Sequence, residues 1–183
     1  DGAGCEVSQT VTVPSAAPVT LSATLTSPIS CNNTNDAVIT VSNAMGGDGN
    51  LLFQLLGEPE TSTNELTFSG LGAGTYTVIA TDGNGCTGNS VATLVNNPSA
   101  IQVFITNSSP ASCFDESDGQ IVVSAFGGAV EASITFSVND ESGLSSPLMV
   151  PGGTFTVIGT DINGCSGSSE EVVIGPDEIV VNA

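Results

Sequence analysis

One thirteen-residue stretch occurs twice in the chain, as residues 74–86 (GTYTVIATDGNGC) and residues 153–165 (GTFTVIGTDINGC). Its last five positions have a third counterpart at residues 1–5 (DGAGC). The cysteines that close these stretches are Cys5, Cys86 and Cys165. The sequence therefore predicts one folding unit repeated about every 80 residues.

Within each copy an alternating stretch leads into a glycine-rich turn. Tyr76, Val78 and Ala80 alternate with threonine and isoleucine, a period of two that is typical of a strand buried on one face. The alternation stops at residues 82–85 (DGNG), where glycine and asparagine tolerate the positive φ angles of a tight hairpin. The repeated element is therefore predicted to be a β-hairpin with a cysteine just past its turn.

The charge of the chain excludes several classes of function. The 183 residues include 19 aspartates and glutamates and no lysine, arginine or histidine, which gives a formal charge of −19. Nucleic-acid binding depends on basic residues that neutralise phosphates. Histidine bases, Schiff-base lysines and arginine clamps are absent as well. We expect neither a nucleic-acid-binding protein nor an enzyme.

Charged residues make up only 10% of the chain, against about 25% in an average soluble domain. The surface must therefore consist mainly of serine, threonine, asparagine and glycine. Disorder is the alternative interpretation of such a composition, but 39% hydrophobic residues with sustained alternation favour folded cores.

The sequence contains neither a run of about 18 apolar residues nor an N-terminal secretion signal. We expect no insertion of this segment into a membrane. Because its first residues already match the end of a repeat, we expect the signal, the anchor and any specialised tip to lie in sequence outside these 183 residues.

Linkers that contain proline mark the predicted domain boundaries. Prolines at positions 18, 98 and 176 each precede an alternating strand. They divide the chain into 1–17 (the last strand of a preceding repeat and a linker), 18–98 and 99–175 (whole domains), and 176–183 (the first strand of a following repeat). Each whole domain is predicted to have about seven short strands. Residues typical of turns, such as glycine, proline, asparagine and aspartate, recur roughly every 8 to 12 positions. The predicted fold is all-β, with tandem immunoglobulin-like antiparallel β-sandwiches.

Each predicted domain contains two cysteines. One pair per repeat in an extracellular chain predicts disulfides between Cys31 and Cys86 and between Cys113 and Cys165, while Cys5 would pair outside the fragment. Each bond would stabilise its domain by roughly 4 kcal/mol in the chain-entropy model. Buried free thiols are the alternative.

Acidic and amide side chains follow the cysteines in a pattern that could hold Ca²⁺. If Cys113 and Cys165 were bonded, the loop at 115–118 would lie beside the turn at 161–163. The same argument in the first domain would place residues 35–36 beside residues 82–84. Clustered carboxylate and amide oxygens are suitable calcium ligands. The candidate residues are Asn35, Asp36, Asp82, Asn84, Asp115, Glu116, Asp118, Asp161 and Asn163. The favoured alternative is that the residues of the two hairpins, Asp82, Asn84, Asp161 and Asn163, are turn residues that bind the backbone.

Two acidic pairs are poor candidates for hydrolytic catalysis. Neighbouring strand residues such as Glu170 and Glu171 point to opposite faces and cannot flank one bond. Glu58 and Glu60 are interpreted as solvated surface. Glycosylation sequons at Asn32 and Asn107 are interpreted as polar loop residues.

The order of these elements resembles the SprB-type repeat of giant bacterial cell-surface proteins. The resemblance rests on a cysteine, a polar loop, a Gly-Gly pair, then residues 71–78 (LGAGTYTV) and 82–86 (DGNGC), with residues 151–157 (PGGTFTV) in the second copy. It covers nearly the whole chain. It implies export by the type IX secretion system, an extracellular location, and a role in gliding motility and adhesion.

Two functions follow as expectations. The first is a structural module, a shaft or spacer in a long surface filament, in which copies of the same chain associate with one another and with neighbouring repeats. The alternative is an adhesin domain that binds a carbohydrate or a calcium-dependent ligand. Near-identical hairpins in both domains favour the structural module.

Overall fold

The computed structural model of the protein describes residues 2–4, 6–57, 64–129, 134–139 and 141–180. These residues form β-strands and turns, and none of the described residues is helical. Every strand pair whose register is described is antiparallel. The predicted all-β fold is confirmed.

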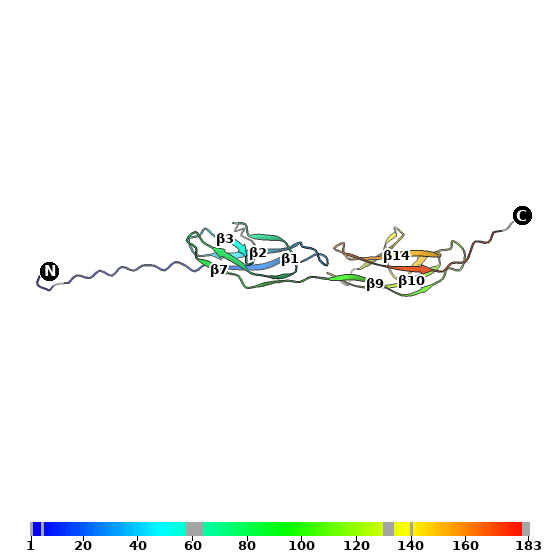
Figure 1. Cartoon of the computed structure of the whole chain (residues 1–183), viewed down its shortest axis with the longest axis horizontal. Helices are drawn as coiled ribbons and strands as arrows, with labels where there is room; N and C mark the ends of the chain where they lie inside the picture. Colours follow the sequence, from blue (N-terminus) through cyan, green and yellow to red (C-terminus); the bar gives the residue numbers. More distant parts are fainter. Residues whose placement is uncertain (1, 5, 58–63, 130–133, 140, 181–183) are drawn as a thin grey trace. The chain divides into compact units, whose positions relative to one another are not determined.

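The seven strands between residues 99 and 175 form two sheets. β9 (Ser99–Ser109), β10 (Gly119–Gly128) and β13 (Leu148–Val150) pair in the order β13-β10-β9. β11 (Thr135–Val138), β12 (Glu141–Leu144), β14 (Gly153–Thr160) and β15 (Ser166–Val173) pair in the order β12-β11-β14-β15. Figure 1 labels β9, β10 and β14 in this group. A three-stranded and a four-stranded sheet in this order form an immunoglobulin-like sandwich.

The core of this sandwich comes from the inward-facing positions of both sheets. In β14, Phe155 and Val157 are buried and alternate with exposed residues. They belong to one cluster with side chains of the other sheet, including Ile121 and Leu148, which are almost fully buried. The period-two pattern therefore selects the buried face, as predicted.

Strands β1 to β8 repeat the same order. β1 (Thr20–Ser27), β2 (Ala37–Met45) and β4 (Thr67–Leu71) form a sheet in the order β1-β2-β4. β3 (Leu52–Leu55), β6 (Val78–Thr81) and β7 (Thr87–Asn89) form another in the order β3-β6-β7. β5 (Gly74–Tyr76) pairs with β8 (Thr93–Val95). Val78 and Ala80 are fully buried, in agreement with the predicted strand face.

The two copies of the repeated strand differ at one point. Residues 153–160 form the unbroken β14, whereas residues 74–81 divide into β5 and β6 at Thr77. Beside this break the Ser90 hydroxyl accepts the Val78 amide at 2.9 Å, and the Thr77 carbonyl accepts the Leu56 amide at 2.8 Å. A side chain thus replaces one backbone partner, and this accounts for the interruption.

The described chain groups into two compact units. One comprises residues 1–24, 40–67 and 76–93, and the other comprises 25–39, 68–75 and 94–183. The predicted boundary at residue 98 would place 25–39, 68–75 and 94–98 with the first group. A covalent bond that ties residue 31 to residue 165 is one reason for the difference.

Candidate functional site: the cysteine-bearing turns

The turn after β6 is organised by one aspartate. The Asp82 carboxylate accepts the amides of Asn84 at 3.0 Å and Cys86 at 2.7 Å with one oxygen, and the amide of Asp48 at 3.1 Å with the other. The Asp82 amide in turn donates to the Cys86 carbonyl at 2.9 Å. Asp82 is only 6% exposed, so its carboxylate closes the turn and satisfies backbone donors that strand pairing leaves free.

The turn after β14 has the same hydrogen bonds. Asp161 accepts the amides of Asn163 at 2.9 Å, Cys165 at 3.0 Å and Ala129 at 3.3 Å. Its own amide donates to the Cys165 carbonyl at 3.0 Å. We call residues 82–86 and 161–165 the hairpin turns. The prediction that their aspartates are turn residues is confirmed.

A second kind of cysteine-bearing turn follows the first strand of each repeat. At residues 31–36 the Thr34 amide donates to the Cys31 carbonyl at 3.2 Å, and Asp36 accepts the Ser30 amide at 3.1 Å. Residue 33 has a φ of 59°. The tight chain reversal places Cys31 just past the end of the strand, where it is half-buried.

Residues 113–118 have the corresponding geometry. The Glu116 amide donates to the Cys113 carbonyl at 3.3 Å, Asp118 accepts the Ser112 amide at 2.8 Å, and Asp115 has a φ of 59°. We call residues 31–36 and 113–118 the strand-end turns.

The disulfide joins one turn of each kind. Cys31 of the first strand-end turn is bonded to Cys165 of the second hairpin turn, with Cα atoms 5.4 Å apart and a sequence separation of 134. Cys86 and Cys113 are free and exposed. The predicted pairs Cys31–Cys86 and Cys113–Cys165 are therefore wrong; Cys5 lies outside the described residues.

The predicted cysteine pairs do not form because each hairpin turn lies at the beginning of the first strand of its repeat, away from the strand-end turn. A Cβ on Gly167, two residues after Cys165, would overlap the carbonyl oxygen of Ile101, the third residue of β9. Cys113 follows the opposite end of β9. The eight steps from Ile101 to Ser109 span roughly 25 Å, whereas disulfide-bonded cysteines have Cα atoms within about 7 Å of each other.

The first repeat has the same arrangement. A Cβ added to Gly88, two residues after Cys86, would overlap the carbonyl oxygen of Val19, which directly precedes β1. Cys31 follows the far end of the eight-residue β1. Each hairpin turn therefore contacts the beginning of its own first strand, and each strand-end turn lies past the end of it.

Hydrogen bonds to the linker hold the bonded strand-end turn in place. The Asn32 side chain donates to the Pro98 carbonyl at 2.8 Å. The Asn33 amide donates to the Asn97 side chain at 2.9 Å, and the Asn97 amide group returns a bond to the Asn33 side chain at 3.2 Å. These contacts were missed in the sequence, where Asn32 reads only as a polar loop residue.

The candidate calcium residues do not come together as predicted. Asp115 lines a hollow with Gly153, whereas Asp161 follows Thr160, so the two acids lie at opposite ends of β14. Glu116 and Asp118 belong to the same strand-end turn as Asp115, and Asn163 belongs to the turn of Asp161. The described residues include no group of three or more Asp, Glu, Cys or His side chains positioned to hold a metal ion.

In the first repeat the candidate acids also have separate partners. Asp36 binds Ser30 and Thr34, next to Asn35, while Asp82 binds the amides of residues 48, 84 and 86. The juxtaposition that motivated a calcium site is therefore wrong in the second repeat, and in the first repeat it stays a prediction. The disulfides on which it rested are not those that form.

The pKa of three turn carboxyls lies below the ordinary value of 3.8. Hydrogen bonds from the Ser30 side chain and amide lower the pKa of Asp36, and those from Ser112 lower the pKa of Asp118. The Cys86 amide is the main cause that lowers the pKa of Asp82. The ionised form of each carboxyl is therefore part of the folded turn.

Glu170 and Glu171 differ in their surroundings. Glu170 is exposed and the neighbouring Glu171 is half-buried, with its carboxylate accepting the Ser108 hydroxyl at 2.6 Å. Residues 58–60 lie outside the described residues.

Aromatic side chains gather on the outer surface of the second sandwich, a feature not predicted from the sequence. Phe104 on β9 and Phe126 on β10 stack with ring centroids 4.9 Å apart and ring planes 12° from parallel. They remain 40% and 53% exposed. The positions that correspond in the first repeat are Ser22 and Met45, so the pair is confined to one copy.

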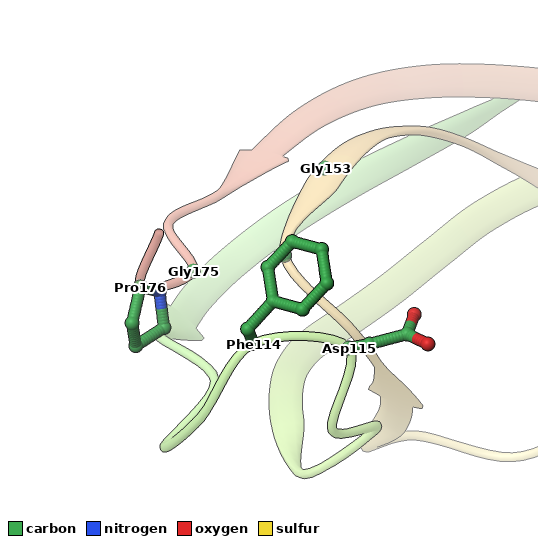
Figure 2. A pocket seen from close by; sticks show the side chains of 6 residues that line it. Phe114, Asp115, Gly153, Gly175 and Pro176 are labelled. Carbon is green, nitrogen blue, oxygen red and sulfur yellow. The ribbon is translucent and has the colours of Figure 1, made fainter. Parts of the chain in front are cut away.

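A hollow of about 390 Å³ lies beside the second strand-end turn. Figure 2 shows the Phe114 ring next to Pro176, with Asp115 directed away from both. Glycines complete the lining at positions 152, 153 and 175. The hollow is thus lined by two apolar rings, glycine backbone and Asp115, and it lies next to the free Cys113.

Comparison with known proteins identifies part of this architecture. Residues 105–143 match the family model of the SprB repeat. This segment is similar to an SprB repeat. The SprB repeat is a module of cell-surface proteins, and the matched segment runs from β9 through the strand-end turn to β12. A search of curated proteins found no match.

A solved structure of a phage protein has a similar fold. The three N-terminal domains of the Highly Immunogenic Outer Capsid protein (Hoc) of bacteriophage RB49 match with a TM-score of 0.50 and 17% identity. The match covers 87% of this chain and 59% of the Hoc chain. At this identity the similarity shows the fold alone. No described helix is long and apolar enough to cross a membrane.

Proposed function

We propose that the chain is a structural, non-enzymatic segment of a long extracellular bacterial filament or adhesin. Its repeats serve as shaft or spacer in attachment, motility or capture of surfaces and prey. The observation that carries the proposal is the bond between Cys31 and Cys165, which ties a turn of one repeat to a turn of the next. A covalent link between successive repeats limits their separation, which suits a spacer.

Two further features support this function. Both hairpin turns use their carboxylate to close the backbone, so they are built as structural elements rather than as open binding sites. The core of the second sandwich is filled by side chains from both sheets. A module that only sets length needs no more than this.

The shaft proposal includes association of several copies of the same chain side by side. A surface poor in charge costs little to desolvate, but carboxylates without cationic partners repel one another across a contact. Salt screens such repulsion beyond about 8 Å at physiological ionic strength. Identical chains that meet head to tail, through two different surface patches, can close into rings. We therefore expect association in high salt or with Ca²⁺.

The experiment is a mass measurement by light scattering in marine-strength salt, with and without millimolar Ca²⁺. A multiple of the chain mass supports side-by-side packing, and a strict monomer contradicts it. Phe104→Ala with Phe126→Ala removes the exposed aromatic pair, and Ile174→Ala, at a residue 73% exposed, is the matched control. Loss of association only in the aromatic variant would place the contact on β9 and β10.

A ligand-binding adhesin domain is the second candidate, favoured by the same aromatic pair. The two stacked rings form a half-exposed apolar patch that a sugar ring could contact, and only the second repeat has it. Binding of a saccharide from a glycan array that is lost in the aromatic variant, with a monomeric protein throughout, would support the adhesin over the shaft. Export by type IX secretion is part of either proposal.

A further inference from the structure

Among the described residues, two cysteines are exposed and unbonded, and they lie in different kinds of turn. Cys86 lies in a hairpin turn and Cys113 lies in a strand-end turn. The bond that forms in the structure joins one cysteine of each kind, Cys165 and Cys31. Each free cysteine therefore has a bonded counterpart.

The counterparts agree in backbone geometry as well as in sequence. The amides of Cys86 and Cys165 donate to an aspartate four positions earlier, at 2.7 and 3.0 Å. Cys31 and Cys113 each accept an amide from three positions later, at 3.2 and 3.3 Å. The free thiols are thus held in the same turns that present the bonded sulfurs.

The surroundings of Cys113 correspond to those of Cys31. Next to Cys31, Asn32 contacts Pro98, and a hollow of about 320 Å³ is lined by residues of the strand-end turn, the start of β9 and the hairpin turn of Cys165. Next to Cys113, Phe114 lies beside Pro176, which occupies the position of Pro98 in the next linker. The residues that line the hollow in Figure 2 include none from a hairpin turn.

We propose that this hollow is the docking site for the hairpin turn of a following SprB-type repeat, and that Cys113 forms a disulfide with the cysteine of that turn. Cys86 forms the same bond with the strand-end cysteine of a preceding repeat. Every repeat is then bonded to both neighbours, and none contains an internal disulfide. The inference deepens the proposed shaft function by naming how its repeats are joined.

The bond forms by thiol–disulfide exchange. Two thiols lose two protons and two electrons, and one molecule of an oxidant of the disulfide class, such as glutathione disulfide, is reduced to two thiols. Pairing needs the thiols to be exposed, as Cys86 and Cys113 are.

The first test is a fusion of two copies of the chain in repeat register. Residues 1–178 of the first copy are joined to residues 19–183 of the second, so that Val19 follows Pro176 at the third position, as Ile101 follows Pro98. Serine replaces Cys5 and Cys86 in the first copy and Cys113 in the second. Each copy keeps its own Cys31–Cys165 bond. The two cysteines that are left are Cys113 of the first copy and Cys86 of the second.

After oxidation by glutathione disulfide, free thiols are blocked with N-ethylmaleimide. Non-reducing peptide mapping should find a disulfide-linked Cys113–Cys86 peptide in protein of monomer mass. The maleimide adducts on these two cysteines, which form before oxidation, should be absent afterwards. Trypsin has no site, because the chain lacks lysine and arginine, so a glutamate-specific protease and chymotrypsin are used. Labelling of both thiols in protein that contains the Cys31–Cys165 bonds would overturn the proposal.

A second test uses the unfused chain in a Cys5→Ser background. The Cys86→Ser and Cys113→Ser variants should stay monomeric alone and form a disulfide-linked dimer when mixed. Equal dimerisation of either variant alone would show homotypic pairing and overturn the proposal. Light scattering under reducing conditions reports side-by-side association separately, so failure of this inference and failure of the shaft model give different results.

Discussion

Cys165 is bonded to Cys31, 134 positions earlier, although the sequence places a nearer cysteine, Cys113, in the same predicted domain. The bond joins the turn after β14 to the turn after β1. Each partner lies in a turn whose own hydrogen bonds fix the cysteine backbone. The pairing therefore depends on which ends of the strands meet, and the following variants test that.

We expect Cys31→Ser, Cys165→Ser and the double variant to lose the same stability, because each removes the same bond. The loss should be about 2–4 kcal/mol. Thermal and urea unfolding measure it. The matched control is Cys113→Ser, which alters an exposed free thiol and should change stability by less than about 0.5 kcal/mol. Additive losses from the two single variants would contradict the pairing.

Ile121→Ala should destabilise the second sandwich by about 2–5 kcal/mol, because the side chain is fully buried between the two sheets and its removal leaves a cavity. The control is Ile162→Ala, at a residue 76% exposed in a hairpin turn. Chemical denaturation followed by circular dichroism should show a shifted midpoint only for Ile121. Equal shifts would argue against the assigned core.

Gly88→Ala and Gly167→Ala should each destabilise by about 1–3 kcal/mol, because a Cβ at either position would overlap the backbone of the first strand. Gly2→Ala is the control, since nothing lies near that position. Similar losses at both sites would support equivalent turns in the two repeats. A neutral Gly167→Ala would contradict the close contact with Ile101.

Acid should destabilise the protein. The pKa values of Asp36, Asp82 and Asp118 are lowered on folding, so their contribution is present above about pH 3.8 and is lost as the pH falls through the folded pKa values. Unfolding temperatures between pH 7 and pH 2 measure this loss. Asp82→Asn keeps an acceptor oxygen but no longer titrates, so its acid sensitivity should be smaller than that of the exposed control Asp177→Asn. If Asp82→Asn loses as much unfolding temperature between pH 7 and pH 2 as Asp177→Asn does, ionised Asp82 does not stabilise the fold.

The fold could be predicted from the sequence because its period-two pattern is strong. Val78, Ala80 and Val157 fall on the buried face as the alternation predicts, and Asp82 and Asp161 close their turns. Such features depend on residues close together in the chain.

The cysteine partners could not be predicted, because one pair per repeat is compatible with bonds within a repeat and with bonds between repeats. One signal was present in the sequence: a glycine follows two positions after both Cys86 and Cys165. A glycine inside a strand often marks close approach of another backbone. In the structure that backbone is the start of the first strand.

The bond between Cys31 and Cys165 also determines which residues bear a force that pulls on the two ends of the chain. A pull on the two ends of the chain is transmitted through the bonded sulfurs, so the peptide enclosed between them bears no load while the bond is intact. Fully extended, 134 residues would add about 450 Å of length. That length stays locked inside the loop, and the segment can resist stretching even when its sheets open.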